Sequence, residues 1–90
     1  MNVKVKYYLW LTSKTGVTED VYVLPDNASI KDLLKEIAKT RRELGDLIEK
    51  VLGGKSELVI LLNSKHPHKG LETPLHDNDV VELLPPVSGG

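Results

Sequence analysis

The sequence predicts an α+β fold, in which a mixed sheet of four to five strands carries helices on one face. Three features lead to this prediction: an alternating N-terminal segment, a capped amphipathic stretch in the middle, and short apolar segments in the second half. A hairpin followed by helices and further strands is typical of this class. A right-handed crossover through the helices would place a later strand parallel to the first. Ninety residues suffice for one small core.

The N-terminal segment alternates apolar and polar residues from Val3 to Leu11, which is the period of a half-buried strand. The odd-numbered positions are expected to face the core. A second strand is expected over residues 17–24, with Val21 and Val23 facing inward. A short polar loop ending at Gly16 would join the two strands as a hairpin.

Two helices are expected in the middle of the chain, over residues 29–41 and 43–52, with one bent helix as the alternative. Ser29 and Asp32 have the spacing of a capping box. Two consecutive glycines after residue 52 would end the second helix. The predicted core of the helical layer is apolar and consists of Leu33, Leu34 and Ile37.

The second half of the chain reads as strands and turns. The apolar run over residues 58–62 predicts a strand in the middle of the sheet, covered on both faces. Residues 71–75 contain a proline and can form only a short edge piece. A turn at residues 77–79 precedes a last strand over residues 80–84. We therefore expect one domain over residues 1–84 and an extended tail over residues 85–90.

Composition excludes several classes of function. Twelve basic and thirteen acidic residues give a net charge of −1, and the four aromatic residues are not interleaved with a basic stripe, which argues against nucleic-acid binding. No apolar run is long enough to span a membrane. The absence of cysteine removes disulfides, thiolate zinc sites and cysteine nucleophiles, and favours a cytoplasmic protein.

No catalytic motif is visible, so we expect a protein that is not itself an enzyme. His66 and His68 flank a proline in a lysine-rich loop, and His76 precedes a turn. Solvated surface histidines are favoured over a metal site, because neither cysteine nor a neighbouring carboxylate accompanies the His66–His68 pair. We expect no bound metal and no permanently bound cofactor.

The C-terminal tail carries the candidate chemistry. It consists of Pro85, Pro86, Val87, Ser88, Gly89 and Gly90. The two prolines favour an extended course, and the two glycines can enter a narrow channel because they have no side chains. The α-carboxylate of Gly90 is ionised at neutral pH and could attack the α-phosphate of ATP inside another enzyme. The alternative is a disordered tail, which would leave a binding module without tail chemistry.

The segment LETPLHDNDVVELLPPVSGG resembles the C-terminal part of the MoaD- and ThiS-like sulfur carriers, which include the small subunit of molybdopterin synthase. It is also similar to the small archaeal modifier proteins and the ubiquitin-related modifier. Asp77, Asp79 and Val81 carry the likeness together with the tail. The resemblance implies the ubiquitin-like β-grasp fold. The loop NSKHPHKG is longer and more basic than is usual in these proteins, and the helical region around RRELGDLIEK is also longer than usual.

The resemblance also implies a mechanism. An E1-like enzyme would use Mg and ATP to adenylate Gly90, and a sulfur donor would convert the adenylate to a thiocarboxylate. In one branch the tail inserts into the large, MoaE-like subunit of molybdopterin synthase and supplies sulfur for the molybdenum cofactor. In the other branch Gly90 is joined to lysines of target proteins, or supplies sulfur for tRNA thiolation. Both branches use the same tail, so the sequence leaves both open.

A partner-binding patch is expected on the open face of the sheet. If the odd-numbered positions of the first strand face the helices, Tyr8 and Trp10 lie on the opposite face. The last strand is apolar on both sides, so Leu83 and Leu84 are expected to extend this patch. Contiguous exposed apolar side chains are typical of docking surfaces. The alternatives are that loops cover these residues, or that the opposite set is the buried one.

Overall fold

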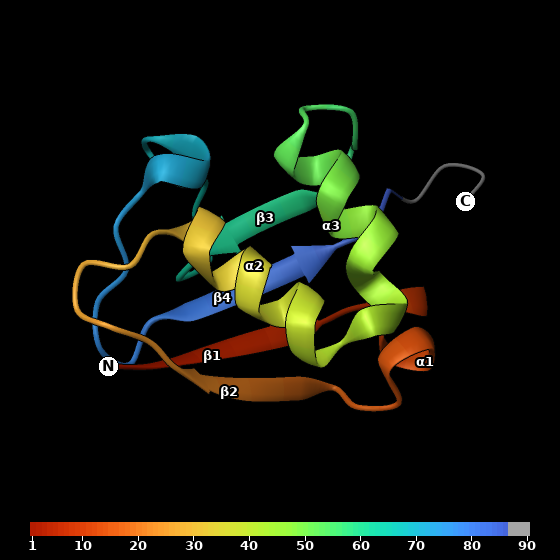
Figure 1. Ribbon diagram of the computed structural model, residues 1–90, viewed down its shortest axis with the longest axis horizontal. Helices are drawn as coiled ribbons and strands as arrows, with labels where there is room; N and C mark the ends of the chain where they lie inside the picture. The colour runs from red at the N-terminus through yellow and green to blue at the C-terminus, as the bar shows by residue number, and fades with distance from the viewer. Residues whose placement is uncertain (87–90) are drawn as a thin grey trace.

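The computed structural model describes residues 1–86, which form a four-stranded sheet in the order β2-β1-β4-β3. The strands are β1 (Asn2–Tyr7), β2 (Glu19–Val23), β3 (Val59–Leu62) and β4 (Val80–Leu84). The helices are α1 (Trp10–Thr15), α2 (Ile30–Thr40) and α3 (Gly45–Leu52), with 3-10 turns η1 (Arg42–Leu44) and η2 (Gly70–Glu72). The central pair β1–β4 is parallel and the two outer pairs are antiparallel. Figure 1 shows α2 and α3 on one face of the sheet, which confirms the predicted α+β class.

Helix α2 forms the centre of the core, as predicted. Leu33, Leu34 and Ile37 are completely buried, and they pack with the inward side chains of β1 and β4. The helix begins at the predicted capping box: the Asp32 backbone N–H donates to Ser29 Oγ, and the Ser29 backbone N–H donates to Asp32 Oδ2. A break at η1 separates α2 from α3, so the region contains two helices and not one bent helix.

The first strand is shorter than predicted. It ends at Tyr7, and the chain then forms a tight turn in which the Leu11 backbone N–H donates to the Tyr8 carbonyl at 3.1 Å. Leu9 occupies the first central position of this turn, at φ 55° and ψ −133°. This is a type II′ geometry, which costs a residue with a side chain about 1–3 kcal/mol. The segment predicted as a hairpin loop is helix α1, which Gly16 ends in the left-handed conformation.

The predicted orientation of β2 is wrong. Val21 and Val23 are 60% and 79% exposed on the open face of the sheet. Asp20 and Tyr22 are half-buried instead, and their side chains face the helical layer. Hydrogen bonds explain this orientation of β2. Tyr22 shares a hydrogen bond with Thr40 at the end of α2, and the Asp20 carboxylate accepts hydrogen bonds from two neighbouring side chains.

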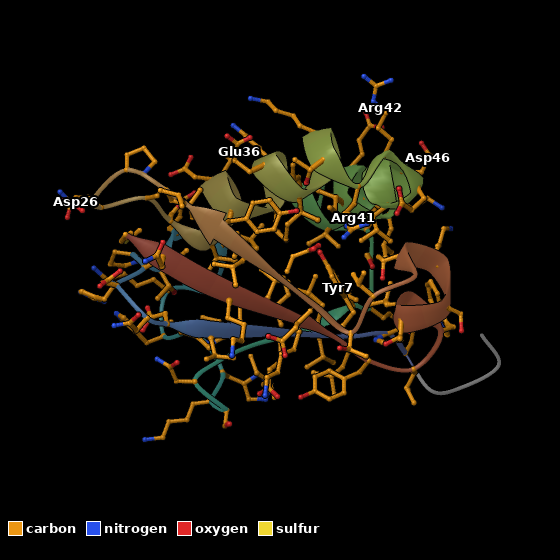
Figure 2. All side chains as sticks on the ribbon, turned by 90° about the horizontal axis from the view of Figure 1, so that it is seen from below. Tyr7, Asp26, Glu36, Arg41, Arg42 and Asp46 are labelled. Atoms are coloured by element: carbon orange, nitrogen blue, oxygen red, sulfur yellow. The ribbon has the colours of Figure 1, made fainter. Side chains whose placement is uncertain are left out.

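These partners of Asp20 are Tyr7 and Arg41, which come from β1 and from the end of α2 and are labelled in Figure 2. The Tyr7 hydroxyl donates to Asp20 at 2.7 Å, and the Arg41 guanidinium donates to both carboxylate oxygens at 2.7 and 2.8 Å. Arg41 also donates to the Thr15 carbonyl at 3.3 Å. The Asp20 cluster therefore joins the edge strand β2 to β1, α1 and α2.

The second half of the chain departs from expectation at two places. Strand β3 lies at the edge of the sheet and not in its middle, and Val59 is 39% exposed. Residues 71–75 form no edge strand; the 3-10 turn η2 occupies their start, and Pro74 makes a single bridge to Ser29. The turn at residues 77–79 and the strand β4 are confirmed, with Asn78 at φ 68°.

The Asp20 cluster predicts a defined loss of stability in acid. Hydrogen bonds from Arg41, and also from Tyr7, hold the pKa of Asp20 below its ordinary value. The ionised carboxylate therefore stabilises the fold above the unfolded-state pKa of about 3.9, and this contribution is lost as pH falls through the lower folded-state pKa.

We expect Asp20→Asn to lower the free energy of unfolding at pH 7 by about 1.5–3 kcal/mol. The variant should also lose part of the pH dependence of stability below about pH 4. Urea unfolding at several pH values measures both effects. An unchanged acid limb in Asp20→Asn would contradict the assignment.

Candidate functional site

Strand β4 delivers the chain to the root of the predicted tail. Leu84 ends the strand, Pro85 is buried and Pro86 is half-buried, so the first two residues of the predicted tail pack against the domain. The other four, Val87, Ser88, Gly89 and Gly90, lie outside the described residues. The structure thus places the point from which the predicted reactive segment leaves.

The parallel pairing of β1 and β4 determines what surrounds this root. Tyr7 pairs with Leu83, and the Tyr8 backbone N–H donates to the Leu83 carbonyl at 3.2 Å. The C-terminal ends of both strands therefore lie at the same end of the sheet. Figure 1 shows that α1 lies at this end as well.

Leu83 does not belong to the predicted partner-binding patch. It is 1% exposed and lies in the core with Val81, so its assignment to the surface is wrong. The physical reason is the register: Leu83 and Val81 pair with Tyr7 and Val5, whose side chains face the helices. Leu84, like Val80, lies half-buried on the open face of β4, and it pairs with exposed Val59 of β3.

Tyr8 and Trp10 are both accessible, but they do not share one face. Tyr8 is half-buried at the end of β1, and its hydroxyl donates to Glu82 at 2.5 Å. This hydrogen bond raises the pKa of Tyr8. Trp10 is 40% exposed in α1, where the ammonium of Lys14 lies 6.0 Å from its ring centroid. The structure therefore brings Tyr8 close to β4 and Leu84, and places Trp10 beyond the sheet.

Several apolar residues lie on the open face although the sequence did not predict them there. They are Val21, Val23, Val59, Leu61 and Val80. In Figure 2, α2 and α3 lie on the other side of the sheet. A polar strip crosses the same face, where Lys4 and Glu19 form an exposed ion pair at 3.4 Å. Alternation from the buried residues of each strand would have found most of these positions once the register was known.

The histidines form no metal-binding group within the described range. His66 and His68 are exposed in the loop after β3. Over residues 1–86, no group of three or more histidine, aspartate and glutamate side chains is close enough to hold a metal ion. None of the helices in that range is both long enough and apolar enough to cross a lipid bilayer.

Comparison with known proteins gives consistent matches. The model of the ThiS family matches residues 5–90. The molybdopterin synthase sulfur carrier subunit of Chlamydomonas reinhardtii is 30% identical over 90 residues, which are all of this chain and all of that protein.

Two solved structures are similar over nearly the whole chain. The small archaeal modifier protein 1 of Methanosarcina acetivorans is 30% identical, with a TM-score of 0.77, and the match covers 99% of this chain and 96% of that one. A complex of subunits 1 and 2 of the molybdopterin-converting factor of Helicobacter pylori contains a chain that is 30% identical, with a TM-score of 0.63 and full coverage of both chains.

Since Leu83 faces the core and Leu84 faces the open side of the sheet, their replacement by alanine should affect stability differently. Leu83→Ala should lower the free energy of unfolding by about 2–5 kcal/mol, because it leaves a cavity in the core. Leu84→Ala should cost clearly less, because Leu84 is only half-buried on the open face. Urea denaturation of both variants measures the difference. An equal or larger loss in Leu84→Ala would show that the opposite face of β4 is buried.

Proposed function

Because the chain belongs to the ThiS family and is a sulfur carrier of the MoaD/ThiS type with the ubiquitin-like β-grasp fold, we propose that it serves as the sulfur carrier subunit of a molybdopterin synthase. The observation that carries the proposal is the end-to-end match to the carrier subunit of Chlamydomonas reinhardtii. The matched chain of Helicobacter pylori belongs to a complex of subunits 1 and 2, which supports a large-subunit partner here.

The proposed reaction takes place at the carboxylate of Gly90. One carboxylate oxygen attacks the α-phosphorus of ATP in an E1-like enzyme, with Mg as that enzyme's ion, and pyrophosphate leaves. A hydrosulfide ion supplied by a sulfur donor then attacks the carbonyl carbon and expels AMP, and loss of the remaining S–H proton leaves a thiocarboxylate. The large subunit receives this tail and uses its sulfur. The cysteine-free composition suits a reducing compartment, and we place the reaction in the cytoplasm.

The described part of the chain contributes a fixed anchor for this tail. Leu84 is held in a strand that has neighbours on both sides, and Pro85 is buried directly after it. Four residues follow Pro86, and they can reach at most about 14 Å. A short arm on a rigid base loses less entropy when it enters a partner's channel than a long free tail would.

A second function in the same family is protein modification. The small archaeal modifier protein 1 of Methanosarcina acetivorans matches as well in identity as the carrier subunit does. In this role the adenylated Gly90 would form an amide bond to a lysine of a target protein, or the tail would supply sulfur for tRNA thiolation. The two roles share the activation step and differ in the acceptor.

Removal of the last two residues tests the role of the tail. The variant that lacks Gly89 and Gly90 should lose all ATP–pyrophosphate exchange with the E1-like enzyme of the same organism. Its thermal unfolding should match that of the full chain, because the core lies within residues 3–83. Exchange at the full rate in the truncated variant would rule out Gly90 as the activated residue.

The mass of the C-terminal peptide tests the chemistry directly. After incubation with the activating enzyme, ATP and a sulfur donor, this peptide should gain about 16 Da, since one oxygen is replaced by sulfur. Addition of the large synthase subunit and its pterin substrate should return the mass to its starting value. A stable thiocarboxylate that the large subunit never consumes would favour the modifier role.

A further inference from the structure

The turn after β1 holds a leucine where glycine is favoured. Leu9 has φ 55° and ψ −133°, and the Leu11 backbone N–H donates to the Tyr8 carbonyl across it at 3.1 Å. The first central position of a type II′ turn is occupied mainly by glycine, because a Cβ crowds the neighbouring backbone there. The chain therefore keeps a side chain at a position that disfavours one.

Burial of the Leu9 side chain within the domain does not offset the strain of its backbone conformation. It is 59% exposed, whereas Leu11, two residues later, is completely buried. Trp10 follows directly and is 40% exposed. Two consecutive large apolar side chains thus project from one turn, at a point where glycine would relieve the strain of the fold. A contact with a partner outside the monomer would account for a leucine here.

The position of the turn indicates what that partner is. The Tyr8 backbone N–H donates to the Leu83 carbonyl at 3.2 Å, so Leu9 follows β1 at the level where the chain passes from Leu84 to Pro86. Figures 1 and 2 show α1 at the end of the molecule where the described chain stops. Any protein that encloses Gly90 must come within about 14 Å of Pro86, which is the reach of four residues. The turn lies at the same end of the sheet as Pro86, so it is a surface that such a protein can contact.

We propose that Leu9 and Trp10 form a docking element for the large subunit of molybdopterin synthase; this inference rests on the proposed function. Of the proteins that would take up the tail, the large subunit is favoured because the matched chain of Helicobacter pylori belongs to a complex of subunits 1 and 2. A hollow of about 370 Å³ adjoins the turn, and its lining includes Tyr8 and Leu9 together with the charged residues Lys6 and Glu19, so it offers a partner both apolar and charged contacts.

The substitution Leu9→Gly distinguishes an effect on folding from an effect on partner binding. This substitution removes the side chain and suits the turn, so the melting temperature should be unchanged or higher. The dissociation constant for the purified large subunit of the same organism, measured by calorimetry with the full-length chain, should rise at least about tenfold. Leu9→Asn, which also tolerates positive φ, should weaken binding in the same way.

Val23→Ala is the matched control. Val23 is 79% exposed and pairs with Asn2 at the opposite end of β1, far from the root of the tail along the strand. This variant should bind the large subunit as tightly as the unaltered chain does. A tenfold loss in Val23→Ala equal to that in Leu9→Gly would show a general effect of apolar surface, and would overturn the assignment of the turn.

Three further outcomes are decisive. If the unaltered chain binds the large subunit and Leu9→Gly binds equally well, the docking element is refuted while the proposed function stands. If the unaltered chain does not bind the large subunit at all, the proposed function fails and the docking element fails with it. Loss of adenylation in Leu9→Gly with unchanged large-subunit binding would assign the turn to the activating enzyme and overturn the proposal.

Discussion

The parallel pairing of β1 with β4 is the constraint on which the rest of the molecule depends. Strands at the two ends of the chain become neighbours at the centre of the sheet, and the intervening helices must cross over one face. Because the pair is parallel, the end of β1 and the end of β4 lie together. The turn at Leu9, helix α1 and the root of the tail are therefore gathered at one end of the domain, although 76 residues lie between Leu9 and Pro86 in the sequence.

Elements with a local signal could be predicted from the sequence, and elements decided by tertiary contacts could not. Helix α2 has a capping box and strict periodicity, so its bounds were correct to one residue. The orientation of β2 was wrong, because Val21 and Val23 look like core residues until Arg41 and Thr40 are known to lie over Asp20 and Tyr22. An edge strand tolerates apolar residues on its outer face, which periodicity alone cannot distinguish from burial.

The candidate site also contains features with a local sequence signal and features that depend on tertiary contacts. The tail is a prediction from composition, since two prolines and two glycines have direct conformational meaning. Its last four residues lie outside the described part of the chain, so that part stays a prediction. Leu83 and Leu84 face opposite sides of the sheet, and a shift of one residue in the register of β4 would exchange their positions. Trp10 is exposed as predicted, but for a different reason. The alternation from Val3 to Leu11 conceals a turn at Leu9, and no residue there signals it, since leucine is rare at such a position.

The chemistry proposed for this protein explains why its surface must carry the recognition. A glycine that has to enter a narrow channel has no side chain by which one partner can be told from another. An activating enzyme and an acceptor would both meet the same two glycines, so discrimination between them falls to the residues around the root of the tail. A rigid root favours this arrangement, because the distance from Pro86 to the reacting carboxylate then limits where each partner can sit. Strain at Leu9 is reasonable in such a protein, since a surface kept for binding is not the surface that would maximise the stability of the isolated domain.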